Sequence, residues 1–522
     1  MLKQYLLFFI LLMLALPGFS QTPDWSSQIA NIIYNNCTSC HREGYIAPFT
    51  LSSYEDAFDN GFAIQSAVNA HIMPPWPPDP NYRHFAYEAV LDQSEIDAIN
   101  QWVDGGMPSG DLATAPDPPA FNNGASTLAS IDHTIQIPTY TTQYAEDEYR
   151  WFVIPSEFTE TMFLNAIEII PGNWSLVHHV DMYFDSTGHS YEQDQEDPLP
   201  GFNYTTGFPA MNYYIGGWSP GGNAIKLPEN WGVRIPAGVD FVLEIHYAPG
   251  NQGALDSTLV NFKYVADTGA VRAVIVDVPI YDFPPSLINP PLKISANEVK
   301  TFFQKSQPMP TDMSYISLSP HMHLIGRTYK IWFETIEGDS FPLIDIPNWD
   351  FHWQMYYMFP YVQKIPEGAR IYAEALYDNT PNNPYNPNNP PITVKQGPYT
   401  TDEMLMTFMS FTEYQPGDED ILLDSSIVAT GSDAIPVSVN GISVYPNPTN
   451  GKVWVTASGM DNQAQLKIIN AVGMVVMEFP VLKASNDMIK KEIDISMLPD
   501  GIYYLNFTSG KRHLSSGILK MN

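Results

Sequence analysis

The chain has two cysteines, Cys37 and Cys40, and His41 follows the second one directly. This C-x-x-C-H spacing is typical of covalent attachment of a c-type haem, because two thioether bonds can fix the porphyrin edge while the neighbouring imidazole reaches the iron. A small disulfide loop and a redox-active C-x-x-C pair are the alternatives, since spare cysteines usually pair in exported proteins. The histidine that follows the pair favours haem attachment.

A haem iron held by His41 needs a sixth ligand, and Met73 is our candidate. Met73 lies 32 residues after His41 in the stretch "HIMPPWPPDP", where prolines exclude a helix. A thioether opposite an imidazole raises the potential of the iron and suits an electron carrier. His71 and Met107 remain as alternative sixth ligands. An isolated methionine is more often a core residue than a metal ligand.

A second group of candidate ligands consists of histidines. Five of the 12 histidines fall in three short stretches with β-strand patterns, and they are His178, His179, His246, His321 and His323. Residues two apart on a strand face the same side, so His321 and His323 can reach one ion. Adjacent residues face opposite sides, so we expect a bulge at His178 and His179.

Imidazoles without thiolates suit copper or zinc. The alternative is that these histidines are ordinary core or surface residues, and His246 taken alone would be interpreted as one. An H-H pair together with an H-x-H pair favours metal binding.

The elements that position these residues differ along the chain. Ile29, Ile32 and Ile33 share one helical face just before the cysteine pair, and Asp92 with Glu95 predicts a capped helix start. The later strand-like runs, with 46 prolines, 33 glycines and 13% aromatic residues, favour turn-rich β structure. The net charge of −33 makes nucleic acid an improbable partner.

Four motifs in this order, "HHVDMYF", "EIHYAPG", "HMHLIGR" and "YTTDEMLMTF", resemble the copper type II ascorbate-dependent monooxygenases. This is the family of dopamine β-monooxygenase and the peptidylglycine α-hydroxylating enzyme, and the resemblance covers roughly 130–415. It implies two antiparallel β-sandwiches that face each other across a water-filled cleft, with one copper ion in each. The stretch 24–111 likewise resembles cytochrome c-like domains that precede bacterial copper monooxygenases.

The resemblance also implies two ligand sets. The electron-storing copper would be held by His178, His179 and His246. The catalytic, oxygen-activating copper would be held by His321, His323 and Met404, since a soft sulfur ligand favours Cu(I). Met406 and Met409 are nearby alternatives to Met404.

Two departures from the family matter. Ser319 stands where the amidating enzymes place an arginine for the substrate carboxylate, which makes a C-terminal glycine a doubtful substrate. Met322 replaces the commoner threonine between the paired histidines, and it should point away from their face.

The two ends of the chain predict export. Residues 1–21 have the layout of a signal peptide, and no later run is long enough to span a bilayer, so we expect no integral membrane segment in the mature chain. The motifs "YPNP" and "LPDGIY" in the tail resemble the C-terminal sorting domain of the type IX secretion system of Bacteroidetes. We therefore expect delivery through the periplasm and outer membrane, with the secretion machinery as a partner.

The predicted fold class is multidomain: a small α-helical cytochrome c-like domain, two antiparallel β-sandwiches and a small β-sandwich tail. The predicted segments are a signal peptide (1–21), haem domain (22–111), linker (112–127), two sandwiches (128–282 and 283–423), linker (424–438) and sorting domain (439–522).

Together these features predict a secreted haem-copper monooxygenase, an oxidoreductase that hydroxylates a C–H bond of a small substrate with dioxygen. Its cofactors would be two copper ions and covalent haem c as an electron relay, with an external electron donor; ascorbate is the candidate reductant that the family suggests. The alternative is a non-catalytic cell-surface protein for electron transfer or copper binding on the same scaffold.

Overall fold

The computed structural model describes residues 22–121, 124–203, 212–265 and 269–423, and, in the tail, 442–445, 449, 451–458, 463–470, 474–483, 488–499, 501–509 and 512–520. The chain divides into two compact units, residues 1–423 and 424–522. The predicted signal peptide and the predicted linker 424–438 lie outside the described residues. None of the helices in the described part is both long and apolar enough to cross a membrane.

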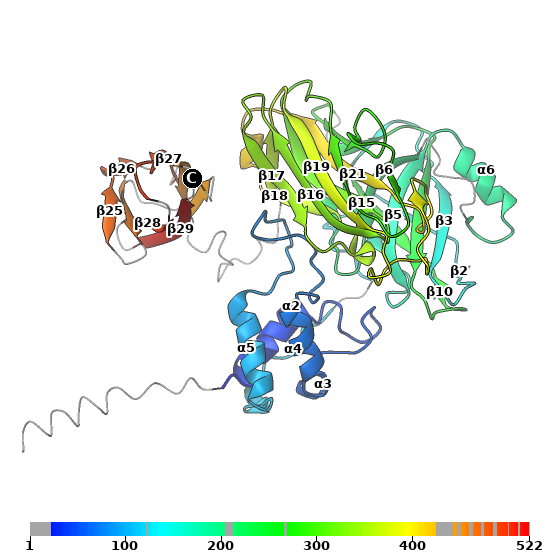
Figure 1. Ribbon diagram of the computed structural model, residues 1–522. Coiled ribbons are helices and arrows are strands. Elements are labelled where there is room, and N and C mark those ends of the chain that lie inside the picture. Colours follow the sequence, from blue (N-terminus) through cyan, green and yellow to red (C-terminus); the bar gives the residue numbers. More distant parts are fainter. Residues whose placement is uncertain are drawn as a thin grey trace, which may run out of the picture. The chain divides into compact units, whose positions relative to one another are not determined.

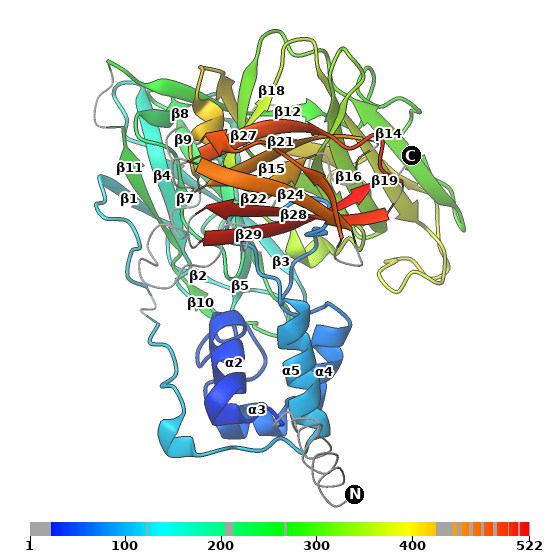
Figure 2. The ribbon, with the colours of Figure 1, turned by 90° about the vertical axis from the view of Figure 1, so that its left-hand side faces the viewer.

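The first unit begins with a small helical part. Its helices are η1 (Trp25–Ile29), α2 (Ala30–Asn36), α3 (Tyr54–Asp59), α4 (Gly61–Asn69), α5 (Gln93–Asp104) and η2 (Leu112–Thr114). The predicted face of Ile29, Ile32 and Ile33 is buried. The predicted capping box of Asp92 and Glu95 is present at the start of α5. Figures 1 and 2 show α4 and α5 side by side in this part of the chain.

The remainder of the first unit is β structure with one short helix, α6 (His189–Glu196). The strands of its first half are β1 (His133–Gln136), β2 (Tyr140–Thr141), β3 (Glu148–Pro155), β4 (Met162–Ile170), β5 (Val177–Asp185), β6 (Asn212–Trp218), β7 (Ile225–Lys226), β8 (Trp231–Ile235), β9 (Asp240–Tyr247), β10 (Leu255–Asp256) and β11 (Leu259–Tyr264). One sheet has the order β3-β9-β5-β6, and the strands β1, β11, β4 and β8 belong to a second sheet. We call this half the first sandwich.

The second half follows the same plan, and we call it the second sandwich. Its elements are β12 (Arg272–Ile280), β13 (Lys293–Ile294), β14 (Val299–Lys305), β15 (Met313–Met322), β16 (Gly326–Glu334), β17 (Ser340–Ile346), η3 (Phe351–Trp353), β18 (Tyr357–Ile365), β19 (Arg370–Asp378), β20 (Val394–Lys395), β21 (Leu405–Glu413) and η4 (Asp418–Asp420). One sheet has the order β14-β19-β16-β17.

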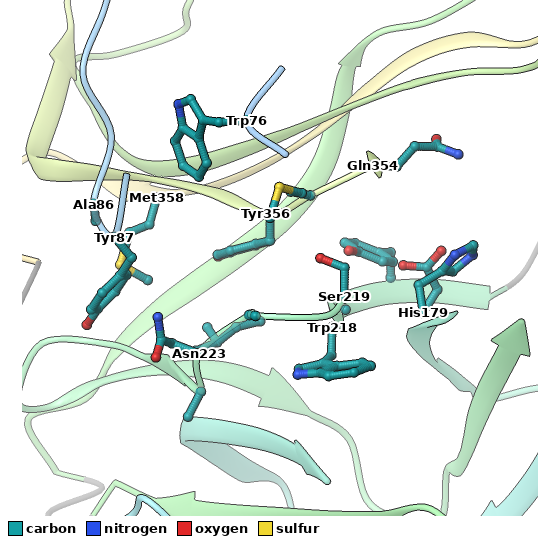
Figure 3. A pocket seen from close by; sticks show the side chains of 18 residues that line it. Trp76, Ala86, Tyr87, His179, Trp218, Ser219, Asn223, Gln354, Tyr356 and Met358 are labelled. Carbon is teal, nitrogen blue, oxygen red and sulfur yellow. The ribbon is translucent and has the colours of Figure 1, made fainter. Parts of the chain in front are cut away.

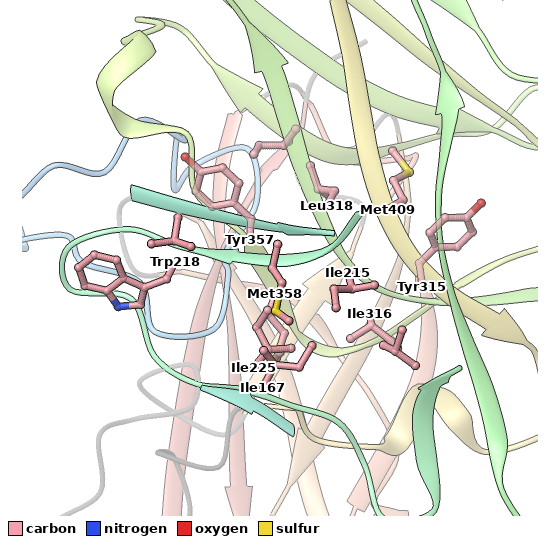
Figure 4. Packing of buried hydrophobic residues seen from close by; sticks show 14 of the residues in the cluster. Ile167, Ile215, Trp218, Ile225, Tyr315, Ile316, Leu318, Tyr357, Met358 and Met409 are labelled. Atoms are coloured by element: carbon pink, nitrogen blue, oxygen red, sulfur yellow. The ribbon is translucent and has the colours of Figure 1, made fainter. Parts of the chain in front are cut away.

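Strand β12 joins the two sandwiches. It pairs in parallel with β8 of the first and antiparallel with β21 of the second, which makes a nine-stranded sheet in the order β1-β11-β4-β8-β12-β21-β15-β18, with β7 beside β4. The two sandwiches also share one hydrophobic core. Figure 4 shows Ile215 and Ile225 of the first sandwich in the same cluster as Ile316, Leu318 and Met358 of the second.

A segment of the helical part, residues 74–88, lies against the second sandwich, and we call it the strap. The Ala86 N–H donates to the Met358 carbonyl at 2.9 Å, and Arg83 donates to the Pro342 carbonyl at 2.8 Å. The Phe85 ring stacks on Phe359 with centroids 5.8 Å apart. Phe85 and Ala86 therefore belong to the sandwich core rather than to the helical core.

The second unit is a separate small β domain with its own core, which includes Val453, Leu466, Leu505 and Phe507. Its strands are β22 (Ile442–Tyr445), β23 (Lys452–Ser458), β24 (Gln463–Asn470), β25 (Val475–Glu478), β26 (Leu482–Lys483), β27 (Met488–Asp494), β28 (Gly501–Ser509) and β29 (Arg512–Lys520). The chain is thus a multi-sheet β protein with a small helical region near its start, as predicted.

Candidate functional site

Three of the predicted ligands come together on neighbouring strands of the first sandwich. Within the β5–β9 pair, His179 lies directly opposite His246, and the register shifts between Val177 and His179. The predicted irregularity is therefore present at His178. The bulge lets two adjacent residues project toward one point, which a regular strand does not allow.

The ring nitrogens of these three histidines converge. The Nδ1 atom of His179 lies 3.3 Å from Nδ1 of His178 and 3.3 Å from Nδ1 of His246. One candidate ligand atom from each of the three residues lies within 4.8 Å of the other two. A tetrahedral ion with metal–nitrogen distances of about 2.0 Å separates its ligand nitrogens by about 3.3 Å. Two of the three nitrogen pairs match this separation, and the group could hold a single metal ion. We call this group the first cluster.

A carboxylate fixes the orientation of His246. Nε2 of His246 lies 2.7 Å from Oδ1 of Asp147, and Tyr149 stacks on the imidazole with centroids 4.3 Å apart. Because Nε2 donates its proton to the carboxylate, Nδ1 of a neutral His246 presents a lone pair to the cluster. Neither Asp147 nor Tyr149 has a sequence signal that marks it as part of a site.

Burial keeps these imidazoles neutral. Burial, with smaller contributions from His246 and His352, lowers the pKa of His178 to about 3. Burial also lowers the pKa of His179 well below its usual value, and it lowers the pKa of His246 despite the opposing effect of Asp147. Neutral imidazoles are the form that binds metal ions.

The other two predicted histidines meet at the end of β15, and we call them the second cluster. The rings of His321 and His323 are 5.0 Å apart, and Met322 between them is buried in the core on the opposite face, as predicted. Nδ1 of His323 lies 3.2 Å from the Asp402 carbonyl, and the backbone of Tyr399 makes a second hydrogen bond with this imidazole. Burial first, then the neighbouring His323, lowers the pKa of His321 to about 3.

The register of β15 with β21 places the candidate methionines. His321 is opposite Met406 and Met322 is opposite Leu405. Continuing the register by one residue sets His323 opposite Met404, so Met404 and Met406 share the face of the two histidines. Met409 is on the other face and is buried in the core, where it cannot serve as a ligand. The choice of Met404 over Met406 stays a prediction.

A short segment around η3 lies against both clusters. The Phe351 ring is 5.9 Å from the His323 ring, and the His352 ring is 5.8 Å from the His178 ring. The side chain of Gln354 lies beside His321. The sequence gives no hint of this arrangement, because "DFHWQ" has neither ligand spacing nor a link to the other histidines.

A cavity of about 80 Å³ opens beside the first cluster. Figure 3 shows its walls, with Trp76 and Tyr87 from the strap, His179 from β5, and Gln354 and Tyr356 from the second sandwich. Trp218 and Gly221 of the first sandwich also line the cavity. The lining that the structure describes contains no lysine or arginine.

The C-x-x-C-H motif forms one tight turn. The His41 N–H donates to the Cys37 carbonyl at 2.9 Å, and both thiols are free rather than joined in a disulfide. Nδ1 of His41 lies 3.0 Å from the Phe49 carbonyl, so the ring is held with Nε2 available. Burial, followed by the influence of Cys40, raises the pKa of the Cys37 thiol to about 12. The pair is thus poorly suited to thiolate chemistry.

The predicted sixth ligand and its alternatives differ in exposure. The Met73 side chain is 36% exposed, whereas Met107 is buried in the helical core against Gly61. His71 is also exposed. The burial of Met107 makes it a core residue, while the assignment of Met73 as an iron ligand stays a prediction.

Comparison with solved structures gives matches of low similarity. They include PNGase F, a glycosylasparaginase from Flavobacterium meningosepticum, with 10% identity over 54% of this chain and 97% of that chain at a TM-score of 0.23. They also include a tetra-tandem repeat of the extending region of a large adhesion protein, with 8% identity over 72% of this chain and 75% of that chain at a TM-score of 0.13. TM-scores this low carry no weight for fold or function. Comparison with curated proteins gives no significant match.

The tail gives a clear result. Residues 443–520 match the family described as the secretion system C-terminal sorting domain. This range lies within the second unit, and it contains the predicted "YPNP" and "LPDGIY" motifs from Tyr445 onward. The chain carries a type IX sorting domain, which directs it to secretion or to attachment at the cell surface in Bacteroidetes.

Proposed function

We propose that the first unit is a haem-copper monooxygenase that hydroxylates a C–H bond of a small substrate with dioxygen. The observation that carries the proposal is the convergence of three histidines, in which Nδ1 of His179 lies 3.3 Å from Nδ1 of both His178 and His246. The presence of a second imidazole pair on the other sandwich, linked to the first by the η3 segment, adds to it.

The first cluster suits an ion that stores an electron. Its three neutral imidazoles form a compact set, and the Asp147 carboxylate holds one of them in the tautomer that a ligand needs. Copper is the metal that imidazole ligands and redox chemistry favour together.

The second cluster suits an ion that meets dioxygen. The Asp402 carbonyl orients His323, and Gln354 lies beside His321, while Met404 is the sulfur candidate on the same face. Two imidazoles and one thioether leave further coordination positions open, which a catalytic metal requires. A copper ion bound there would supply the reduction of dioxygen.

The helical part suits a covalent haem. His41 is held through Nδ1, and the two thiols of the motif are free. The helical part also exposes the apolar side chains of Phe62, Ile72 and Met73. A haem attached there would supply one electron at a time. The raised pKa of the Cys37 thiol speaks against the redox-active C-x-x-C alternative.

The cavity supports a substrate without negative charge. Its described lining offers aromatic rings and no cationic side chain. Ser319, which stands where the amidating enzymes place an arginine, is neutral and donates to the Met355 carbonyl at 3.1 Å. Nε1 of Trp76 is a buried donor with no partner among the described residues. A neutral small molecule with a hydrogen-bond acceptor fits these features.

The test begins with metal and haem content of the purified protein. We expect about two copper ions and one covalent haem per chain. The protein is then reduced without oxygen and exposed to dioxygen and candidate substrates, and product mass is followed for one added oxygen atom. Reoxidation without oxygen incorporation across the screen would favour the non-catalytic electron-transfer protein, and absence of copper would overturn the monooxygenase.

A further inference from the structure

The helical part contacts the first sandwich next to the haem-attachment motif. The Tyr45 ring stacks on Trp174 with centroids 5.1 Å apart and an angle of 24° between the planes. Tyr45 is 7% exposed, so the contact is closed to solvent on its side. A Cβ atom added to Gly221 would lie 3.7 Å from Sγ of Cys40, so that the backbone of the first sandwich closely approaches the second thiol of the motif.

Trp174 continues the contact into the first sandwich. Its ring packs on Trp218 with centroids 5.7 Å apart at 79°. Trp218 is the last residue of β6, where it pairs with Val180, the residue that follows His179 on β5. Trp218 and His179 also line the same cavity. A short series of aromatic rings therefore leads from the C-x-x-C-H motif to the first cluster.

We propose that Tyr45, Trp174 and Trp218 form the electron path from the helical part to the first cluster. The proposal rests on the proposed function and adds the route and the direction of transfer. With both groups bound, each transfer would oxidise a haem iron(II) held by His41 to iron(III) and reduce a copper(II) ion held by the first cluster to copper(I). The three aromatic residues would undergo no net change in oxidation state, because the electron would tunnel through their packed rings.

Packing is the reason to expect this route. Electron tunnelling weakens less through close-packed side chains than across a water-filled gap, and the two ring contacts are of van der Waals type. A competing route starts at Met73 and passes along the strap to Trp76, which also lines the cavity. The two routes leave the helical part on different segments, so substitutions can separate them.

The first experiment examines the contact and needs no catalysis. Hydrogen exchange is measured by mass spectrometry on the full chain as purified, for wild type and Tyr45→Leu. We expect faster exchange in the peptide that contains Gly221 and Gly222, since the Tyr45 ring lies over this loop and Trp174. Unchanged exchange would show that the helical part does not rest on this loop.

The second experiment measures electron transfer. The fully oxidised protein receives one electron from a photoactivated donor without oxygen, and haem absorbance reports its loss to copper. Trp174→Leu should slow the transfer on the order of tenfold, because leucine leaves a gap in the packed path. Trp174→Phe should retain most of the rate because it keeps a ring. A normal rate in Trp174→Leu would instead favour the competing route through Met73 and Trp76.

Trp332→Leu is the matched control, because Trp332 stacks on Tyr372 with centroids 5.9 Å apart at 15° in a similar pair on β16 and β19. If Trp174→Leu does not fold, the electron-transfer rate of Tyr45→Leu tests the same path. With haem and copper both present, a wild-type rate in Trp174→Leu overturns the path and leaves the proposed function standing. A wild-type protein without haem or copper overturns both.

Discussion

The first cluster draws three imidazoles from one pair of strands, whereas the second draws two from the end of a single strand. The first depends on a bulge at His178, and the second depends on the ordinary alternation of a strand. The orienting groups differ as well: a side-chain carboxylate, Asp147, holds His246, whereas a backbone carbonyl, that of Asp402, holds His323.

Under the proposed function, this difference separates two kinds of metal chemistry. A compact set of three imidazoles suits an ion that changes its charge while keeping its ligands. Two imidazoles with a nearby thioether leave room for another molecule to bind, as catalytic metals require. Substitutions that affect one cluster and spare the other test this contrast.

Removing one imidazole from each cluster should have the largest effect. We expect His246→Ala and His321→Ala each to lose one of about two copper ions per chain, because each removes a ligand from a different site. Copper content after dialysis against a weak chelator measures this. If either variant kept both ions, the residue would not be a ligand and the contrast between the clusters would be lost.

Met404→Ile should affect the reaction with dioxygen more than the metal count. Isoleucine removes the soft sulfur that favours Cu(I), so reoxidation of the reduced protein should slow by at least about tenfold. Met406→Ile is the control, since Met406 shares the same face one pair further along. Stopped-flow absorbance measures the rate of reoxidation in both variants. Slow reoxidation in Met406→Ile with a normal rate in Met404→Ile would transfer the ligand role to Met406.

Asp147→Asn should weaken the first cluster by a smaller amount. Loss of a carboxylate that orients a ligand typically costs about 10- to 100-fold in metal affinity. Asp402→Asn is its counterpart at the second cluster and should leave affinity unchanged, because the backbone carbonyl holds His323. Competitive titration with a copper indicator compares them, and equal losses would remove the distinction between side-chain and backbone orientation.

The junction between the sandwiches should matter least for each single cluster. Arg272 of β12 pairs with Asp418 at 2.7 Å and lies over the Trp231 ring at 4.1 Å. Arg272→Met should lower the free energy of unfolding by about 2 kcal/mol, because the buried Asp418 carboxylate loses its charged partner and keeps only neutral donors such as Ser314. Both copper ions should still be lost in one thermal transition, since β12 belongs to both sandwiches.

The same pair gives a pH dependence. Burial opposes the shift, but hydrogen bonds from Arg272 and Ser314 lower the pKa of Asp418 below its usual value. A lowered pKa contributes stability above the unfolded value of about 3.9, and this stability is lost as pH falls through the folded value. The difference between wild type and Arg272→Met should therefore shrink as pH falls below about 5 and on through the lowered pKa of Asp418. Chemical denaturation at a series of pH values measures this, and a constant difference would contradict it.

Local patterns predicted much of the cluster geometry. Two adjacent histidines cannot share a face on a regular strand, so the bulge at His178 follows from the sequence alone. The shared face of His321 and His323 and the burial of Met322 follow from strand alternation. The capping box of Asp92 and Glu95 is a local signal of the same kind.

The parts that could not be predicted depend on pairing between distant segments. Asp147 meets His246 because β3 pairs with β9, and Phe351 meets His323 because of a loop in the second sandwich. Nothing in the spacing of these residues sets them apart from ordinary polar and aromatic residues. The parallel pairing of β12 with β8 is likewise a tertiary feature, and no local pattern of residues 272–280 indicates it.

The strap has a consequence for how such a protein can be rearranged. In the chain it lies between α4 and α5, so the helical part is interrupted by a segment that completes the core of the second sandwich. A recombination event at the linker 112–127 would carry Phe85 and Ala86 away with the helices, and the rings of Tyr357 and Phe359 would lose their cover. The helical part and the second sandwich should therefore be inherited together. If another helical domain replaced this one, it would have to cover the apolar surface that Phe85 and Ala86 leave behind.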